Sequence, residues 1–198
     1  MMGGSNEQEV LTKAEVMELY SHTNSRLVKA ILALAYGCGL RKREIRVLNT
    51  GDVLFHKGIV NVHGKNNKSR TVPMSDRVIK DLKEYIVYER PKRINSNSPT
   101  EAFILNKHGE RFVSCAINGH YLKNLAEATG NKEIIRKGVH LHALRHAIAT
   151  HLVEEGAPIE FVKRFLGHSL LDTTVLYCKK RKLQKLQELQ KRQQAITS

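Results

Sequence analysis

The chain has 198 residues, of which 41% are apolar, so it is long enough and apolar enough to bury a core. Its 33 lysines and arginines against 19 acidic residues give a formal net charge of +14, which favours a nucleic acid or an anionic membrane as partner. The longest apolar segment, residues 31–36, falls far short of the roughly 20 apolar residues that span a bilayer. We therefore expect nucleic acid, and no membrane, as the partner.

The three cysteines, Cys38, Cys115 and Cys178, are an odd number and show no CxxC spacing. This pattern predicts reduced thiols in a reducing compartment. His142 and His146 have the i, i+4 spacing of metal ligands, but no acidic residue follows at ligand spacing, so we expect no zinc site. No secretory signal opens the sequence.

The first part of the chain predicts helices over residues 12–21, 25–36 and a short stretch after Arg41. Thr12 and Glu15 have the spacing of a capping box, and Gly37 stops the second helix.

The periodicity then changes to short β-branched runs separated by turn residues. These runs predict a small antiparallel sheet with strands over residues 53–55, 58–63 and 69–73. Residues 64–68 form the tip of the hairpin between the last two strands. Ser75 then caps a helix that reaches about residue 90, where Pro91 ends it, and a further short strand is expected over residues 103–105.

The second half reads as almost entirely helical, over residues 114–129, 142–155, 158–166 and 170–178, with a tail helix to about 194. Pro158 suits a first helical turn and Gly167 a left-handed C-cap. The predicted fold class is α+β, mainly helical, with a three-stranded antiparallel sheet at one edge. Since no Pro/Gly-rich linker divides the chain, we expect one domain over residues 10–178, preceded by a disordered or foreign segment, 1–9.

The tail, residues 179–198, is strongly basic. Between Lys179 and Arg192 it holds seven basic residues and one acid, with leucines spaced by threes at Leu183, Leu186 and Leu189. A helix this polar is marginal alone in water. Docking on a second protomer, folding back in cis and disorder are the three alternatives.

Several residues suit phosphoryl transfer, which needs fixed cations around the phosphate, a proton donor and a nucleophile. Arg41 follows a Gly-rich turn and opens a helix, and His142 and Arg145 share a helix face at i, i+3. Lys65 on the hairpin tip is a candidate acid, and Tyr177 a candidate nucleophile. Each signal taken singly is also what an ordinary surface or core residue shows.

Taken together in chain order, four segments resemble the conserved boxes and hairpin of the tyrosine recombinases, the phage integrase family. They are residues 39–45 (Gly-Leu-Arg-x-x-Glu-Ile), 64–73 (Gly-Lys, then Arg-Thr-Val-Pro), 142–152 (His-x-x-Arg-His, then Thr-His-Leu) and 166–177 (Leu-Gly-His-Ser to Tyr). Order and spacing agree over about residues 10–180, and the pattern is most similar to Xer-type and phage-integrase catalytic domains.

The resemblance implies roles residue by residue, for Arg41, Lys65, His142, Arg145, His168 and Tyr177. The two arginines would clamp the scissile phosphate, and the two histidines would hydrogen-bond it or assist proton transfer. Lys65 would protonate the 5′ leaving oxygen, while Tyr177 would attack to give a 3′-phosphotyrosyl bond. Glu44 is expected to orient Arg41 or His142, and Asp52 to be structural.

The resemblance also implies DNA contacts by Lys42, Arg43, Lys68, Arg70 and His146. It implies site-specific recombination or integration of double-stranded DNA, with strand exchange through a Holliday junction and no cofactor or metal. The expected assembly is a homotetramer on DNA whose protomers are linked by exchange of their C-terminal helices. We expect the protein in the cytoplasm, associated with the nucleoid while it acts on DNA. Family members carry a further N-terminal domain, and only about 40 residues precede Arg41, so we expect a truncated chain rather than a naturally minimal one.

Two other functions fit the same motifs less well. A non-catalytic DNA-binding regulator of this fold would have little reason to retain all six catalytic residues. A type IB topoisomerase shares the chemistry, but His-x-x-Arg followed by Leu-Gly-His looks more like an integrase.

Overall fold

The computed structural model describes residues 9–64, 69–94, 100–112 and 117–167, of which Asn118 and Gly119 are described by their backbone alone. The chain divides into two compact units, residues 1–148 and 149–198. The predicted helices beyond residue 167 and the candidates Lys65, Lys68, His168 and Tyr177 lie outside the described residues. Within the described part, no helix is long and apolar enough to cross a membrane.

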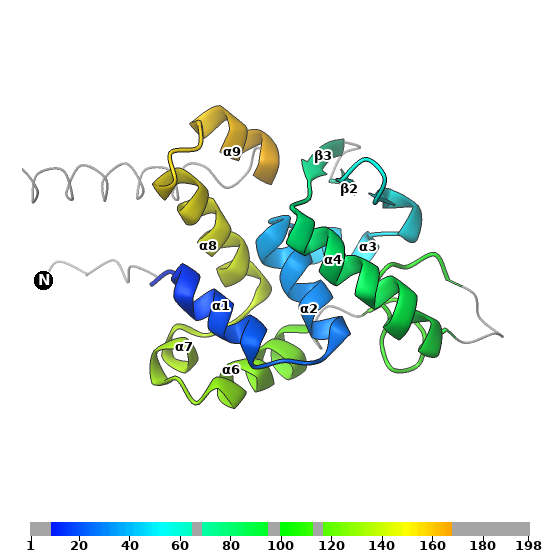
Figure 1. Ribbon diagram of the computed structural model, residues 1–198, viewed down its shortest axis with the longest axis horizontal. Helices are drawn as coiled ribbons and strands as arrows, with labels where there is room; N and C mark the ends of the chain where they lie inside the picture. The colour runs from blue at the N-terminus through cyan, green and yellow to red at the C-terminus, as the bar shows by residue number, and fades with distance from the viewer. Residues whose placement is uncertain (1–8, 65–68, 95–99, 113–116, 168–198) are drawn as a thin grey trace, which may run out of the picture. The chain divides into compact units, whose positions relative to one another are not determined.

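The first unit is built mainly of helices (Figure 1). They are α1 (Lys13–Ser21), α2 (Arg26–Leu32), α3 (Lys42–Val47), α4 (Asp76–Glu84), α6 (Lys123–Thr129), α7 (Lys132–Lys137) and the first part of α8 (Leu141–Glu154). Shorter helical turns join them: η1 (Ala33–Gly37), η2 (Thr50–Asp52), η4 (Tyr85–Glu89), η5 (Arg90–Lys92) and η6 (Ile117–Leu122). The expected helical starts are confirmed, because Thr12, Ser25 and Ser75 cap α1, α2 and α4 with their hydroxyls.

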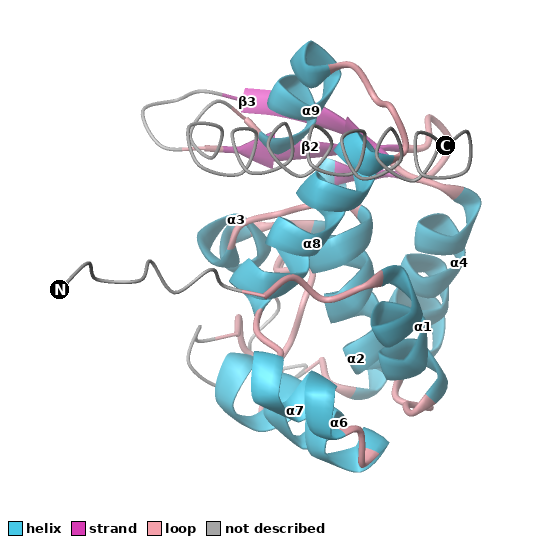
Figure 2. Cartoon of the chain, turned by 90° about the vertical axis from the view of Figure 1, so that its left-hand side faces the viewer, coloured by secondary structure: helices cyan, strands magenta, loops and turns pink. Residues whose placement is uncertain are grey.

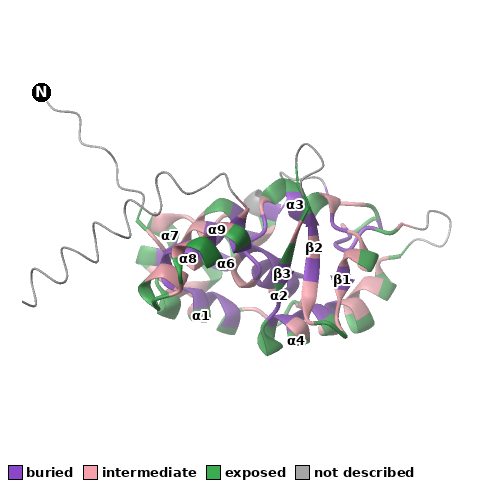
Figure 3. Cartoon of the chain, turned by 90° about the horizontal axis from the view of Figure 1, so that it is seen from above, coloured by how far each residue is buried: buried purple, intermediate pink, exposed green. Residues whose placement is uncertain are grey.

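A small sheet accompanies these helices, as predicted. Strands β1 (Val53–Leu54), β2 (Ile59–His63) and β3 (Ser69–Pro73) pair antiparallel in that order. Val53, Val60 and Val72 lie opposite one another across the three strands, and all three are buried. Figure 3 shows that the sheet has buried stretches along its strands. Because a slip of one residue would turn these valines toward solvent, this row fixes the register of the hairpin.

The core of the first unit is centred on α2 and η1, where most residues are buried. Helix α2 packs against α4, as Figure 1 shows. Helix α6 contacts both α1 and α7 (Figure 2). The longest apolar segment of the sequence, residues 31–36, is therefore at the centre of the packing, which gives the segments that follow it a rigid base.

The predicted strand over residues 103–105 is wrong. The segment makes only isolated bridges, Asn49 with Ala102 and Leu105 with Arg111. Side chains satisfy the nearby backbone instead: Arg90 donates to the carbonyls of Thr100 and Ala102, and the Tyr85 hydroxyl accepts from the Leu105 N–H. The apolar pattern marked burial and not a strand.

Two helix predictions also need correction. Helix α7 was not predicted, although Asn131 caps it through its side chain and Gly138 ends it. The helix predicted to stop at residue 90 continues into η5, where Pro91 stands in the first turn and needs no N–H donor.

The described part of the second unit consists of the last part of α8 and the whole of α9 (Ile159–Leu166). Pro158 is the N-cap of α9, and Gly167 ends it with a φ of 70°. The predicted helix over residues 158–166 and its glycine stop are therefore confirmed.

Replacing Tyr85 by Phe is expected to lower the free energy of unfolding by about 1–3 kcal/mol, because the buried Leu105 N–H loses its acceptor at 3.0 Å. Urea unfolding followed by circular dichroism measures the change. Tyr88→Phe is the matched control, since the Tyr88 side chain is mostly exposed, and we expect less than about 0.5 kcal/mol there. Equal effects of both substitutions would contradict the assigned role of the Tyr85 hydroxyl.

Candidate active site

Arg41 stands at the junction between the core and α3. The π-helical segment η1, which continues α2, ends in a turn. In this turn the Leu40 N–H donates to the Leu34 carbonyl, and Gly39 has a φ of 59°. This left-handed conformation favours glycine. Arg41 follows as the N-cap of α3, with its side chain 30% exposed. The turn thus delivers a partly exposed guanidinium on a rigid support.

Glu44, in the first turn of α3, accepts hydrogen bonds from two arginines. Its Oε2 accepts from the Arg41 backbone N–H at 2.7 Å, and its Oε1 from Arg41 Nη1 at 2.7 Å. Arg70, on β3, donates to both oxygens, at 2.7 and 2.9 Å. With only 4% of its side chain exposed, the Glu44 carboxylate is held almost entirely by these partners.

Arg145 of α8 completes this group of charges. Its side chain is 1% exposed, with Nη1 3.9 Å from Glu44 Oε2. The same nitrogen donates to the carbonyl oxygen of Gly39, in the turn that carries Arg41. We refer to Arg41, Glu44, Arg70 and Arg145 as the arginine cluster. The structure thus brings together the two arginines predicted to bind the phosphate and the glutamate predicted to orient a catalytic neighbour. The fourth member, Arg70, was predicted to contact DNA.

The charges of the cluster shift one another's pKa values. Burial by itself would raise the pKa of Glu44, but the hydrogen bonds and charges of Arg70 and Arg41 outweigh it and lower that pKa to about 2. Burial and the positive charge of Arg41 lower the pKa of Arg145, and Glu44 opposes this shift. Arg145 nevertheless remains protonated at neutral pH, as guanidinium groups do in proteins.

Histidines line the start of α8. The His140 Nδ1 atom accepts from the Ala143 N–H at 3.1 Å and so acts as a helix cap, a role that the sequence did not suggest. The His140 ring stacks on the ring of His142 at 6.4 Å between centroids. His142 is exposed, whereas burial and then the proximity of His142 lower the pKa of half-buried His146. His142, one turn before Arg145, is thus accessible to a ligand.

Asp52 ties the base of the hairpin to the segment after α3. Its Oδ2 accepts from the Asn49 N–H at 2.8 Å, and its Oδ1 lies 3.0 Å from His63 Nε2. These contacts agree with the structural role expected for Asp52. Lys42 and Arg43, on α3 beside Arg41, are both exposed.

Cys38, next to the Gly39 turn, has a free and fully buried thiol. Burial raises the pKa of this thiol to about 12. It therefore stays protonated and is not a candidate nucleophile at neutral pH.

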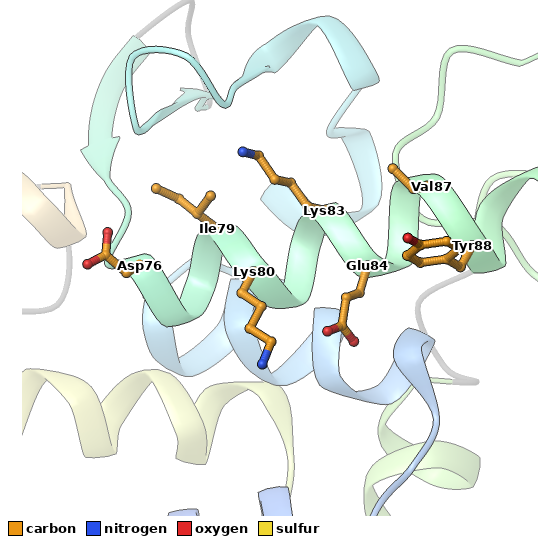
Figure 4. Close-up of a pocket in the computed structure, with 7 residues that line it drawn as sticks. All are labelled: Asp76, Ile79, Lys80, Lys83, Glu84, Val87 and Tyr88. Atoms are coloured by element: carbon orange, nitrogen blue, oxygen red, sulfur yellow. The ribbon is translucent and has the colours of Figure 1, made fainter.

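A shallow pocket of about 490 Å³ lies on α4 and η4. Figure 4 shows Ile79, Lys83 and Val87 on one side of the helix and Lys80 and Glu84 on the other. Two lysines and two acids (Asp76, Lys80, Lys83 and Glu84) line it, so its charges balance. The arginine cluster, with its excess of positive charge, is the better candidate for an anionic ligand such as a phosphodiester.

Comparison with known proteins agrees with this interpretation. The model of the phage integrase family matches residues 9–184. The tyrosine recombinase XerD of Staphylococcus epidermidis is 37% identical over 169 residues, 85% of this chain and 55% of XerD. That of Staphylococcus saprophyticus is 38% identical over the same shares of both chains. The chain thus spans about half the length of these curated relatives.

Solved structures show the same fold. The XerA recombinase superposes with a TM-score of 0.75 at 26% identity, over 89% of this chain and 60% of XerA. The XerH recombinase bound to its difH substrate superposes with a TM-score of 0.69 at 20% identity, over 85% of this chain and 49% of XerH. The predicted fold, a mainly helical recombinase catalytic domain with a three-stranded sheet, is confirmed.

The lowered pKa of Glu44 predicts a pH-dependent contribution to stability. A carboxyl whose pKa falls from 4.5 to about 2 on folding stabilises the fold fully above pH 4.5 and loses this contribution as the pH falls toward 2. The shift corresponds to about 3 kcal/mol. We therefore expect Glu44→Gln to lower the free energy of unfolding by roughly this amount at pH 7, with the deficit shrinking below pH 4.5.

Urea unfolding between pH 2 and pH 7 measures this difference. Glu101→Gln, at an exposed position, is the matched control and is expected to change little at any pH. A Glu44→Gln deficit that does not vary with pH would argue against the ion pairs as its source.

Proposed function

The chain belongs to the phage integrase family of tyrosine recombinases, and from this membership we propose that it cleaves and rejoins double-stranded DNA at specific sites through Tyr177. The observation that carries the proposal is the pairing of Arg41 and Arg145 around Glu44. Two guanidiniums fixed by one buried carboxylate suit a phosphate, whose oxygens accept hydrogen bonds from the planar forks of arginine.

The proposed reaction balances without an external energy source. The phenolic oxygen of Tyr177 attacks phosphorus, the bond from phosphorus to the 5′ oxygen breaks, and a 3′-phosphotyrosyl bond forms. The phenol gives up its proton, which His142 helps to remove, and Lys65 donates a proton to the leaving 5′ oxygen. Attack by a 5′ hydroxyl of the partner strand reverses these steps, so strand exchange proceeds through a Holliday junction without a nucleotide or metal cofactor.

The arginine cluster would supply the electrostatic part of this catalysis. Negative charge grows on the non-bridging oxygens as the pentacoordinate phosphorus forms, and donors fixed beforehand stabilise it most. Arg41 and Arg145 are such donors, since the core turn and Glu44 hold them before DNA arrives. The roles of Lys65, His168 and Tyr177 rest on the sequence motifs.

DNA contacts outside the reacting phosphate are proposed for Lys42, Arg43, Lys68 and His146. The exposure of Lys42 and Arg43 beside Arg41 supports this, as does the formal charge of +14. On its DNA the protein would be associated with the nucleoid. We further propose a homotetramer on two duplexes, in which the tail over residues 179–198 docks on a neighbouring protomer.

Covalent trapping on a nicked suicide duplex, taken from the DNA that flanks the gene, tests the chemistry. With EDTA present, we expect a denaturant-stable protein–DNA adduct that Tyr177→Phe abolishes while DNA binding is kept. A gel shift on the same duplex shows that both proteins bind. An adduct that needs magnesium, or none from bound wild type, would refute the proposal, and relaxation of a plasmid without any specific site would favour a type IB topoisomerase.

Deleting residues 180–198 tests the proposed docking of the tail. The truncated protein is expected to bind a single site but to lose the tetrameric complex, because the deletion removes the leucines that would dock on a neighbour, Leu183, Leu186 and Leu189. Gel filtration and native gels at several protein concentrations, with and without DNA, measure this. Unchanged assembly and recombination would exclude docking in trans.

A further inference from the structure

The family motifs leave one member of the arginine cluster, Arg70, without a catalytic task. The resemblance to the recombinases assigned it to DNA contact. In the structure its side chain is 13% exposed, and Nη1 and Nη2 both donate to Glu44, at 2.7 and 2.9 Å. Its two terminal nitrogens are thus directed at a protein carboxylate.

We propose that Arg70 is a positioning residue, which acts through Glu44 to hold Arg41 and Arg145 in the arrangement that binds the scissile phosphate. This inference rests on the proposed function. It replaces a direct DNA contact by an indirect role.

Geometry is the first argument. The terminal torsion of a glutamate is soft, so a carboxylate held at one point can turn. Arg70 grips both oxygens at once, which fixes the carboxylate plane as a single donor cannot. Arg41 Nη1 then meets an oxygen in a set position at 2.7 Å, and Arg145 Nη1 lies 3.9 Å from the other oxygen. Without Arg70, Glu44 would keep only its bonds from Arg41, to the backbone N–H and to Nη1, and its charge would act on Arg41 and Arg145 alone.

Charge is the second argument. Three guanidiniums against one carboxylate leave the cluster with an excess of two positive charges. A phosphodiester carries one negative charge, and a second develops as the pentacoordinate phosphorus forms. If Arg70 is removed, Glu44 neutralises half of the charge on Arg41 and Arg145. Arg70 therefore contributes to transition-state stabilisation without touching DNA, in a site where burial strengthens such effects.

The sheet explains how Arg70 reaches Glu44. Arg70 and Val72 are two residues apart on β3, so both side chains point to the same face. Val72 is fully buried opposite Val60, which fixes the register of β3 against β2. The same register that buries the valines turns Arg70 toward α3.

The test compares three substitutions in the full chain. Arg70→Gln removes the charge and the fork, and Arg70→Lys keeps the charge but offers a single ammonium. Arg90→Gln is the matched control, because the partly buried Arg90 guanidinium is also held by hydrogen bonds, three of them, all to backbone carbonyls of Thr100 and Ala102. Urea unfolding curves identify an assay temperature at which every variant is fully folded.

Two quantities are measured on the suicide duplex. The first is the rate of adduct formation at saturating DNA, and the second is the slope of log binding constant against log salt concentration. A lost phosphate contact lowers that slope by about 0.9. We expect Arg70→Gln to cleave about 10- to 100-fold more slowly with an unchanged slope. Arg70→Lys should be intermediate, and Arg90→Gln should cleave at the wild-type rate.

A slope lowered by about 0.9 in Arg70→Gln identifies a DNA contact and overturns the proposal, whatever the rate. A wild-type cleavage rate in Arg70→Gln, or an equal loss in Arg90→Gln, also overturns it. The wild-type protein separates the two levels of inference. If it binds the duplex and forms no adduct, the proposed function has failed and the role of Arg70 with it, whereas an active wild type confines any failure to Arg70.

Discussion

The hydrogen bonds and ion pairs of the Glu44 carboxylate join parts of the chain that are distant in the sequence. Arg41 lies at the start of α3, Arg70 on β3 and Arg145 on α8, and their guanidiniums would repel one another in a low-dielectric site. Glu44 offsets that repulsion, and its own burial is tolerable because four hydrogen bonds compensate it. Segments from α3, β3 and α8 thus meet at this one carboxylate.

Two apolar features of the fold hold the cluster from different sides. The buried run through α2 and η1 ends in the Gly39 turn, which places Arg41 and supplies the carbonyl that accepts from Arg145. The valine row of the sheet fixes β3, which places Arg70. Substitutions in either feature would therefore reach the site indirectly, because packed interiors transmit small shifts as displacements of rigid elements.

Local signals in the sequence predicted most of the described elements. The hydroxyl caps at Thr12 and Ser75 and the short β-branched runs of the sheet are short-range features with a direct physical cause, so they needed no tertiary information. The predictions failed where contacts with distant parts of the chain, and not the local sequence, determined the local structure. Residues 103–105 look like a strand, but Arg90 and Tyr85 provide bonds in place of a neighbouring strand. Helix α7 is too short for a periodic pattern, so its cap at Asn131 and its stop at Gly138 were not enough to predict it.

The sequence by itself determined the family, the fold class and the chemical identity of the candidate site, because boxes of fixed spacing carry residue types that phosphoryl transfer requires. It also indicated that Glu44 would orient a catalytic neighbour. Only the tertiary structure decided which cations share that carboxylate, and it placed Arg70 among them, with hydrogen bonds to both oxygens of Glu44. The physical reason is that sequence spacing predicts neighbours within one helix or strand, whereas the meeting of α3, β3 and α8 depends on how the core packs.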